Sequence, residues 1–379
     1  IFPVLIIPVI VANVMVALVL SKRHMITPTN VVLKYMAIAD LFVGLTPLPW
    51  TLYYFTLGNY QHPERVEGWW CHAQKMSMDT LPPIFHNIAM WLTVLLATQR
   101  FISISYPLYS RSICNVSNVR IATLVIAIVS FVCGAPKLFD YDVLFFDGYM
   151  VNSPNDTKAT YVRSCMTKPT AIVNAIGIDI FFSVYFWTRA IVFVIFPSIL
   201  LIALNAGLIL GIQRAKQRKM RLLREKRSRD IQRATDSNST SLMLVIIVTV
   251  FIIVNLPQAF FMALICIQET FSVSIPFMTG EFPLMFLLID NMAIIATYPI
   301  NFAIYCFMSS SFRQTFSSLF CRNVVVFRRP AETESSVINE TKKDNSSIPL
   351  VKIMPDDSML ANDENGIIRR DRRNDSVYL

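Results

Sequence analysis

The sequence predicts an all-α membrane protein whose helices form a bundle of seven transmembrane spans. Three observations predict it. Of the 379 residues, 54% are hydrophobic and only 16% are charged, too few charges to cover a soluble protein. Several apolar stretches reach the roughly 20 residues that a helix needs to cross a hydrocarbon core of about 30 Å. The basic residues, finally, gather in some connecting loops and avoid others.

Seven apolar stretches are the expected spans. Apolar residues run nearly all round each of them, whereas a helix of a soluble protein has one apolar stripe. A backbone inside lipid must satisfy its own hydrogen bonds, and a helix does so within one segment. The expected spans are 1–20, 31–57, 80–105, 119–136, 186–212, 241–267 and 282–307. The first stretch is apolar from Ile1 onward, so we expect an extracellular segment to precede it.

The connecting loops predict the orientation. The loop 213–240 contains ten lysines and arginines, whereas the turn 268–281 contains none. Cytoplasmic loops hold the excess of basic residues, so we expect a multi-pass plasma-membrane protein with its amino terminus outside and its carboxyl terminus in the cytoplasm. The net charge of +9 is then mostly cytoplasmic. The lipid bilayer, with its anionic lipids, is the ordinary partner of such charge, which implies no nucleic acid.

The residues beyond the last span differ in composition from the rest. Segment 322–379 is polar, rich in serine and mixed in charge, so it buries too little apolar surface to fold alone. We therefore expect a seven-transmembrane domain at 1–321 and a disordered cytoplasmic tail at 322–379.

Few polar side chains lie within the spans, and each is costly in hydrocarbon. Asn13 lies in the first span, Asp40 near the middle of the second, and Asn301 toward the inner end of the seventh. Two interpretations of Asp40 stay open: a hydrogen-bonded structural cluster, or a switch whose ion or proton occupancy differs between two states. Arg100 ends the third span, and by position alone it fits an arginine that reaches back to lipid headgroups.

Prolines recur inside the spans. Pro197, Pro257 and Pro299 each remove a helix hydrogen bond and kink the chain. Both roles of such kinks, in helix packing and as hinges, stay open.

The order of these residues resembles that of the rhodopsin-like G-protein-coupled receptors, over residues 10–321. The matching positions are Asn13, Asp40, Trp70, Cys71, Gln99, Arg100, Phe101, Pro197, Pro257, Asn301 and Tyr305. The resemblance implies a seven-helix receptor with a short amphipathic helix 8 that begins near Ser311. It implies that Gln99, Arg100, Phe101, Asn301 and Tyr305 serve activation and G-protein coupling, and that Asn13, Asp40 and Asn301 form the buried polar switch.

The sequence also departs from the family pattern. Gln99 stands where an acid usually holds the neighbouring arginine, Asn255 stands where tryptophan is common, and Phe302 replaces a proline of the seventh helix. The separation of Cys71 and Arg100 is about one helical turn longer than in the family. We expect the two prolines at 82–83 to absorb that turn.

These departures point to a subgroup. The stretch Leu-Pro-Pro-Ile-Phe-His at 81–86, the Gln-Arg-Phe at 99–101 and the Tyr-Pro-Ile-Asn-Phe-Ala-Ile-Tyr-Cys at 298–306 are similar to the invertebrate myosuppressin and sex-peptide (myoinhibitory peptide) receptors. Nematode relatives and the FMRFamide-receptor-like families resemble them too. The resemblance implies an extracellular neuropeptide ligand, small and C-terminally amidated, and signalling through a heterotrimeric G protein.

Four covalent modifications follow from the resemblance and the expected orientation. Cys71 and Cys165 fall on the oxidising side, where they pair as a disulfide or remain two free thiols. Asn155 begins an N-glycosylation triplet in the outer loop 137–185. Cys321, just past the expected helix 8, is a palmitoylation candidate. Serines of the tail are candidate phosphorylation sites that would recruit arrestin.

The ligand-binding residues are the least determined part. Pro82 stands where amine receptors place an aspartate, so an amine lacks its usual counter-ion. His86, Asp179, Glu269, Glu281 and Asp290 are candidates, the acids as partners of a basic peptide residue. Each acid is equally explained as solvated loop charge or a structural polar contact.

Other functional classes fit less well. An opsin needs a lysine in the seventh span, and 282–307 contains none. A channel or transporter needs a polar path or repeated halves, and neither is evident. The histidines show no metal-ligand spacing, so we expect neither an enzyme nor a cofactor. A chemosensory or odorant receptor of the same architecture is the alternative that stays open.

Overall fold

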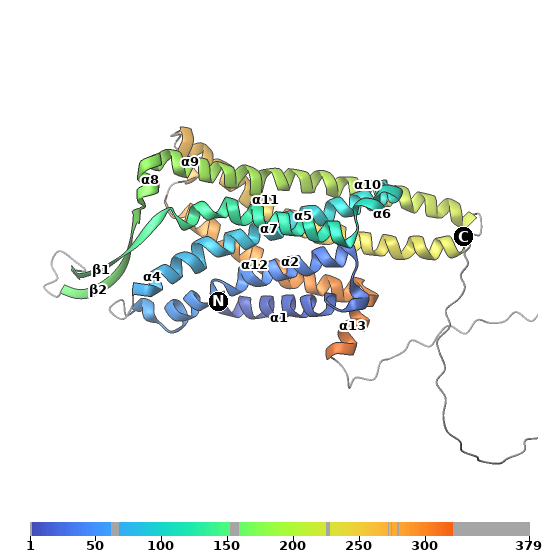
Figure 1. Cartoon of the computed structure of the whole chain (residues 1–379), viewed down its shortest axis with the longest axis horizontal. Coiled ribbons are helices and arrows are strands. Elements are labelled where there is room, and N and C mark those ends of the chain that lie inside the picture. Colours follow the sequence, from blue (N-terminus) through green and yellow to red (C-terminus); the bar gives the residue numbers. More distant parts are fainter. Residues whose placement is uncertain are drawn as a thin grey trace, which may run out of the picture. The chain divides into compact units, whose positions relative to one another are not determined.

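The computed structural model describes residues 2–61, 68–151, 159–224, 228–271, 273, 275–278 and 280–320. Long helices lying side by side make up this part of the chain (Figure 1). Six of them are long and apolar enough to cross a membrane, and the shorter apolar helix Val4–Leu20 supplies a seventh. The expected seven-helix bundle is therefore confirmed. The tail from residue 321 lies outside the described residues.

The helices follow the chain in order. The first two columns are α1 (Phe2–Leu20) and α2 (Pro28–Leu45), the latter continued by α3 (Leu48–Thr51) and the π-helical turn η2 (Leu52–Thr56). The third combines α4 (Gly68–Gln74), the π-helical segment η5 (Lys75–Thr80) and α5 (Leu81–Ser105). The fourth is α7 (Val116–Gly134), and the fifth combines α9 (Ile178–Thr188), the π-helical segment η7 (Arg189–Ile195) and α10 (Phe196–Arg224). The last two are α11 (Ser228–Phe271) and α12 (Phe282–Met308).

Short elements join the columns. They are the 3₁₀ turns η1 (Arg23–Met25), η3 (Asn59–Gln61), η6 (Ala135–Leu138) and η8 (Pro276–Met278), and the helices α6 (Pro107–Ile113), α8 (Ala171–Ile176) and α13 (Ser310–Phe320). Thr27 and Asn115 cap α2 and α7, because their side chains accept hydrogen bonds from the backbone N–H groups of Asn30 and Asn118.

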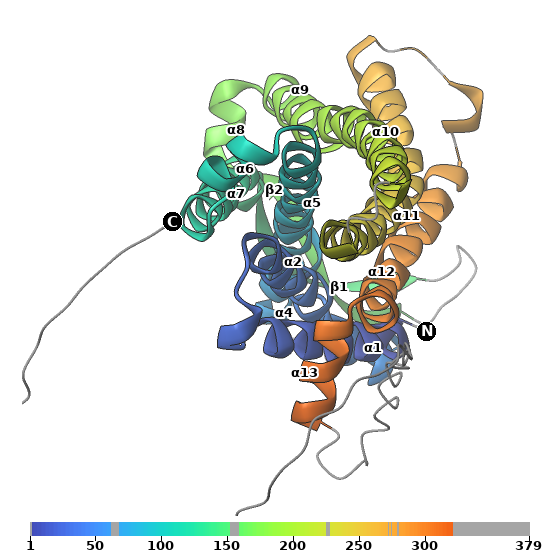
Figure 2. The ribbon, with the colours of Figure 1, turned by 90° about the vertical axis from the view of Figure 1, so that its right-hand side faces the viewer.

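The columns close into a ring when viewed along their axes (Figure 2). In order round the ring, α1 packs on α2, α2 on α5, α5 on α10, α10 on α11, α11 on α12, and α12 on α1 again. Helix α7 lies outside this ring against α2 and α5. Much of its surface is apolar and exposed, Leu124 for example at 60%. An apolar face with no protein partner suits contact with lipid.

A two-stranded antiparallel ribbon adds to the expected all-α fold. Strands β1 (Tyr141–Val151) and β2 (Ala159–Pro169) pair so that Phe145 lies opposite Cys165. The strands lie within a stretch that hydropathy assigns only to a loop, but their aromatic and β-branched residues favour extended pairing. The ribbon marks one end of the bundle, which we call the hairpin end, and α13 marks the opposite end, which we call the α13 end (Figure 1).

The third column extends further toward the hairpin end than expected. The predicted span began at residue 80, whereas helix continues unbroken from Gly68. The polar residues before position 80 lower the local hydropathy, so hydropathy alone does not predict this extension. The π-helical segment η5 ends directly before Leu81, so the irregularity lies one turn earlier than the expected site at Pro82 and Pro83. Neither proline donates a backbone hydrogen bond, which frees carbonyls of the preceding turn.

Three apolar clusters hold the bundle together. One, at the α13 end, joins Val16 and Leu33 with Tyr305 and Phe312. A second joins α5, α10 and α11, and the third contains Val9, Val43 and Tyr298 with their neighbours on α12. Because these clusters connect residues far apart in sequence, they fix the polar side chains that lie between them.

Candidate functional site

A cavity of about 230 Å³ lies among the helices toward the hairpin end. We call it the bundle cavity. Its lining residues come from five columns, so its shape depends on how the whole bundle packs. They are Val43, Pro47, Met78, Pro82, Pro83, His86, Arg189, Gln258, Asn291, Ile294 and Ile295. Apolar walls with a few polar groups are typical of sites for small ligands.

Four polar side chains face the bundle cavity. His86 comes from α5, Arg189 from the start of η7, Gln258 from α11 and Asn291 from α12. Arg189 sits where the helix switches to the wider π form, a feature frequent at functional sites. Among the described residues that line the cavity there is no carboxylate. The cavity therefore carries positive charge.

His86 connects the cavity to the centre of the bundle. Its Nδ1 lies 3.3 Å from the hydroxyl of Tyr298, whereas its Nε2 is buried without a hydrogen-bond partner among the described atoms. Asn255, which stands where the family commonly has tryptophan, is 2% exposed. Its amide donates to the Phe251 carbonyl at 2.8 Å, and its Oδ1 has no partner among the described atoms.

The buried polar residues continue toward the α13 end. Asp40 is 2% exposed, and its carboxylate interacts electrostatically with both Tyr298 and Tyr305. Asn13 donates from Nδ2 to the Val9 carbonyl at 3.0 Å, a bond within its own helix. The side chain of Asn301 lies outside the described atoms. Polar groups thus run from the bundle cavity through His86, Tyr298 and Asp40 to Tyr305.

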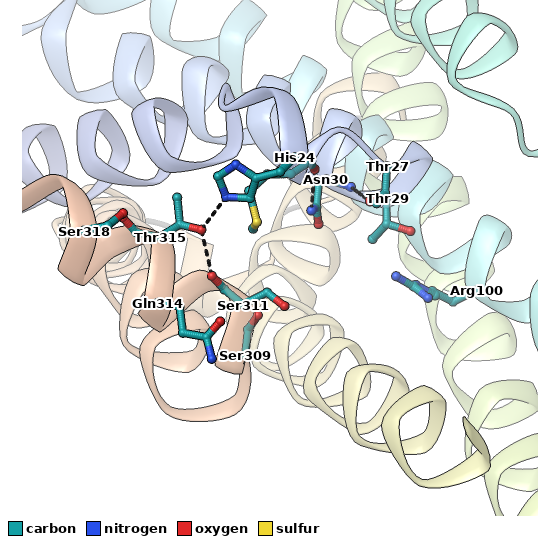
Figure 3. A pocket seen from close by; sticks show the side chains of 11 residues that line it. His24, Thr27, Thr29, Asn30, Arg100, Ser309, Ser311, Gln314, Thr315 and Ser318 are labelled. Carbon is teal, nitrogen blue, oxygen red and sulfur yellow. Dashed lines mark hydrogen bonds between the residues drawn. The ribbon is translucent and has the colours of Figure 1, made fainter. Parts of the chain in front are cut away.

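A second cavity, of about 660 Å³, opens at the α13 end and is called here the α13 cavity. It lies between η1, the start of α2, the end of α5 and α13 (Figure 3). Its lining residues are His24, Met25, Thr27, Thr29, Asn30, Arg100, Ser309, Ser311, Gln314, Thr315 and Ser318. They include hydroxyls, amides and two basic groups, and no carboxylate is among them.

Arg100 extends from α5 toward this cavity (Figure 3). Its Nε is buried without a hydrogen-bond partner among the described atoms. The preceding Gln99 is 4% exposed, and its amide oxygen and nitrogen also lack partners among the described atoms. No ion pair among described residues holds Arg100, which matches the loss of the acid at position 99.

Contacts of α13 shape the far wall of the α13 cavity. His24 Nε2 lies 2.9 Å from the Thr315 hydroxyl, which joins η1 to α13 (Figure 3). Phe312 is 1% exposed and packs against Tyr305, with ring centroids 5.6 Å apart. Phe302, at the position of the family's proline, meets the Phe312 ring edge-on at 6.2 Å. The helix expected near Ser311 is present, with its apolar face against α12.

The hairpin end is held by a disulfide and an ion cluster. The structure joins Cys71 to Cys165, which ties β2 to the third column. Beside this bond, Asp140 is 1% exposed and accepts from Lys137 at 2.8 Å and from Lys75 at 3.0 Å. Lys75 also donates to the backbone carbonyls of Leu138 and Tyr141. These contacts fix the ribbon over the end of the bundle.

The acidic residues predicted as ligand partners lie elsewhere. Asp179 and Glu281 are exposed and do not line the bundle cavity. Asp290 is 7% exposed, and its Oδ2 has no partner among the described atoms, but it too is absent from the lining. The Glu269 side chain lies outside the described atoms. So do Asn155 and Cys321, the predicted sites of glycan and lipid.

Sequence reasoning missed Arg189. Its signal was a single charged residue inside the apolar run 180–197, and an ionisable residue within a membrane span is a functional candidate by default. Because it lies near residue 186, where the predicted span begins, it resembles an ordinary residue at the membrane–water interface. The structure instead turns it toward the bundle cavity.

Comparison with known proteins agrees with this architecture. The family described as serpentine type 7TM GPCR chemoreceptor Srw matches residues 2–323. Sex peptide receptor-related protein 2 of Caenorhabditis elegans is 57% identical over 355 residues, 93% of this chain and 78% of that protein. The sex peptide receptor of Drosophila melanogaster is 32% identical over 337 residues, 89% of this chain and 75% of that protein. The FMRFamide receptor of the same fly is 22% identical over 342 residues, 87% of this chain and 55% of that protein. With seven apolar helices and a family match along nearly all of the described chain, the protein belongs to the serpentine seven-transmembrane G-protein-coupled receptors, which are signalling receptors and not enzymes.

Proposed function

We propose that this receptor responds to a small extracellular neuropeptide with an amidated carboxyl terminus and signals through a heterotrimeric G protein. The 57% identity to a sex peptide receptor-related protein over 93% of the chain carries the proposal. The FMRFamide receptor adds to it, since that relative's name includes an amidated peptide. The bundle cavity supplies a site at which the end of a peptide fits among apolar walls.

We propose that the hairpin end faces the outside of the cell. The Cys71–Cys165 disulfide supports this orientation, because such bonds persist in oxidising compartments. The ten basic residues of 213–240 support it from the other side, since most of them belong to the end of α10 and the start of α11, which lie at the opposite end (Figure 1). An epitope inserted at residue 225 should then be reached by antibody only after the plasma membrane is permeabilised. Labelling of intact cells at that position would contradict the orientation.

Glycosylation gives a second test of orientation. Asn155 would carry a glycan on the outer side, and removal of glycans should lower the mass of the wild-type receptor but not that of Asn155→Gln. A mass shift that persists in the variant would count against this site. Palmitoylation of Cys321 and recruitment of arrestin by tail phosphorylation are further proposals for the cytoplasmic side.

We propose that binding favours a state in which α10 and α11 separate at the α13 end. A ligand shifts such an equilibrium only by its difference in affinity for the two states. The opened α13 cavity, with Arg100 at its edge, would admit the G protein. Asp40, Asn301 and Tyr305 would couple the two ends, and Pro197, Pro257 and Pro299 would act as hinges. Gln99 and Phe101 flank the coupling arginine.

The receptor role of Arg100 is tested by Arg100→Ala in full-length receptor on cells. Signalling, read as calcium and cyclic AMP after a panel of amidated peptides, should be abolished while binding of the active peptide stays measurable. Arg111→Ala, an exposed arginine of α6 outside the α13 cavity, is the control and should signal normally. Full signalling by Arg100→Ala would remove Arg100 from the mechanism.

A chemosensory receptor is the second candidate, because the matching family is described as chemoreceptors. The two candidates differ in ligand. A peptide receptor responds to members of the amidated panel, whereas a chemosensory receptor responds to small odorants and to none of the peptides. Silence to all peptides, with surface expression confirmed, would favour the second candidate.

A further inference from the structure

Arg189 places a positive charge at the bundle cavity, although the residues around it in the sequence are mostly apolar. Arg189 is half-buried, and its neighbour Ala190 is fully buried, so this part of η7 packs against the bundle. It also lies beside Pro83 and Asn87 in the narrower space between the third and fifth columns. Its side chain therefore turns toward α5, with the bundle cavity next to it.

The described residues offer Arg189 no anionic partner. Neither the bundle cavity nor the narrow space beside Asn87 is lined by a carboxylate among the described residues. Asp140 is bound by Lys75 and Lys137 at the hairpin end. A cation that is half-buried without a counter-ion loses part of its hydration, so such groups are commonly paired or serve binding.

The neighbouring polar groups have spare hydrogen-bonding capacity. His86 Nε2 has no partner at hydrogen-bond geometry among the described atoms, although its side chain interacts with Asn255, and Gln258 and Asn291 line the same space. A guanidinium offers five N–H donors in a planar fork that fits carbonyl and carboxylate oxygens. The cavity thus combines a cationic donor with neutral amides and apolar walls.

We propose that Arg189 is the ligand-recognition residue of this receptor, binding an oxygen acceptor on the peptide, either an amide carbonyl or a carboxylate. The part of the peptide that enters the bundle cavity is then neutral or acidic, and a basic residue is excluded from it. This inference rests on the proposed peptide function and replaces pairing between an acidic receptor residue and a basic peptide residue. Two positive charges repel each other strongly in a medium of low dielectric constant, so Arg189 disfavours a cationic ligand group.

Small probes test this chemistry without knowledge of the natural peptide. Three phenyl compounds share an apolar group for the cavity walls: N-acetylphenylalanine carries a carboxylate, N-acetylphenylalanine amide carries a neutral carbonyl, and phenethylamine carries a cation. Each is added at millimolar concentration to solubilised full-length receptor, and the melting temperature is followed by tryptophan fluorescence. A probe at ten times its Kd should raise the melting temperature by roughly 2–4 °C.

The variants are Arg189→Met, Arg189→Lys and Arg189→Glu, with Lys168→Met, an exposed change on β2, as control. We expect wild type, Arg189→Lys and the control to be stabilised by the two acceptor probes and not by phenethylamine. Arg189→Met should lose the response, and Arg189→Glu should respond to phenethylamine alone. Without probe, Arg189→Met should melt at a higher temperature than wild type, because a half-buried charge without an anionic partner among the described residues is removed.

The comparison of the two acceptor probes identifies the source of the oxygen. A larger shift with the carboxylate indicates an acidic peptide group, and equal shifts indicate the carbonyl of a peptide amide. Equal or no stabilisation by all three probes in wild type would overturn the inference, as would an unchanged preference in Arg189→Glu or a lower melting temperature of probe-free Arg189→Met. If the probe preference holds but no peptide activates the receptor in cells, the peptide function fails while the chemistry of Arg189 stands.

Discussion

Nδ1 of His86 in α5 lies 3.3 Å from the hydroxyl of Tyr298 in α12, within hydrogen-bond distance. The two residues are 212 positions apart in the sequence. His86 lines the bundle cavity, whereas Tyr298 is 1% exposed and interacts electrostatically with Asp40. The pair therefore connects the bundle cavity with the buried polar residues at the centre of the bundle. A ligand group that binds Nε2 of His86 would act directly on this contact.

The contact should be measurable as a coupling energy. Tyr298→Phe removes only the hydroxyl and His86→Phe removes the ring nitrogens, and each should lower the thermal stability of ligand-free receptor. In a double-mutant cycle the two changes should be non-additive by about 0.5–1.5 kcal/mol, the net value of a typical buried hydrogen bond. Tyr109→Phe, at a tyrosine 69% exposed, is the matched control and should change nothing. Strict additivity of the pair would show that the two groups do not interact.

Asp140 should be necessary for the ribbon at the hairpin end. Asp140→Asn leaves the ammonium groups of Lys75 and Lys137 without their shared carboxylate. Removal of one partner from a buried ion pair costs about 3–5 kcal/mol, and the partial exposure of both lysines reduces that figure. We expect lower surface expression and a lower melting temperature.

The control for Asp140 is Asp142→Asn, because Asp142 is an exposed aspartate at the start of the same ribbon. It should express and melt like wild type. If both variants lose expression equally, the effect belongs to the ribbon's total charge and not to the cluster around Asp140.

The bundle itself could be predicted because each span carries its signal locally, as an apolar run of sufficient length. The ribbon of β1 and β2 could not, since its position depends on the contacts of Asp140 and on the disulfide, which join residues far apart in sequence. The start of the third column at Gly68 could not be predicted either, because it also depends on tertiary contacts. Its polar residues are helical because of tertiary contacts such as those of Lys75, which hydropathy does not report.

The residues of the candidate site also fall into those that the sequence predicts and those that it does not. His86 was predicted from a family motif and does line the bundle cavity, whereas Asp179 and Glu281 were chosen for their charge and lie outside it. Arg189 was missed because its orientation follows from the π-helical segment it begins, and that register is a property of the packed column. Charge alone shows which residues are available for binding. The fold decides which of them share a cavity.

Gly207 should be sensitive to any added side chain. A Cβ built on this residue of α10 lies 2.7 Å from the Phe101 ring, closer than real Cβ contacts allow. Phe101 follows Arg100, so Gly207→Val should push α10 away from α5 near the α13 cavity. We expect a loss of about 1–3 kcal/mol in stability, seen as a lower melting temperature, together with weaker G-protein coupling.

The matched control for Gly207 is Ala206→Val, which also adds methyl groups to α10 at an exposed position next to it in sequence. Its melting temperature and coupling should stay near those of wild type. An equal loss in both variants would mean that β-branching in the helix, and not contact with Phe101, is responsible.

His24 and Thr315 should hold α13 in place. Their 2.9 Å contact is a side-chain hydrogen bond between η1 and α13, and Thr315 is 5% exposed. Thr315→Val keeps the shape of the side chain and removes the hydroxyl, which also donates to the Ser311 carbonyl of the same helix at 2.9 Å. At about 1 kcal/mol for the bond, local opening of α13 should increase roughly fivefold, which amide hydrogen exchange in the helix would record. Gln314→Ala changes an exposed neighbour that makes no hydrogen bond to His24 or Thr315 among the described atoms, and it should leave exchange unchanged. If Thr315→Val also exchanges like wild type, burial of Phe312 against Tyr305 is sufficient to hold α13, and His24 contributes only to the lining of the cavity.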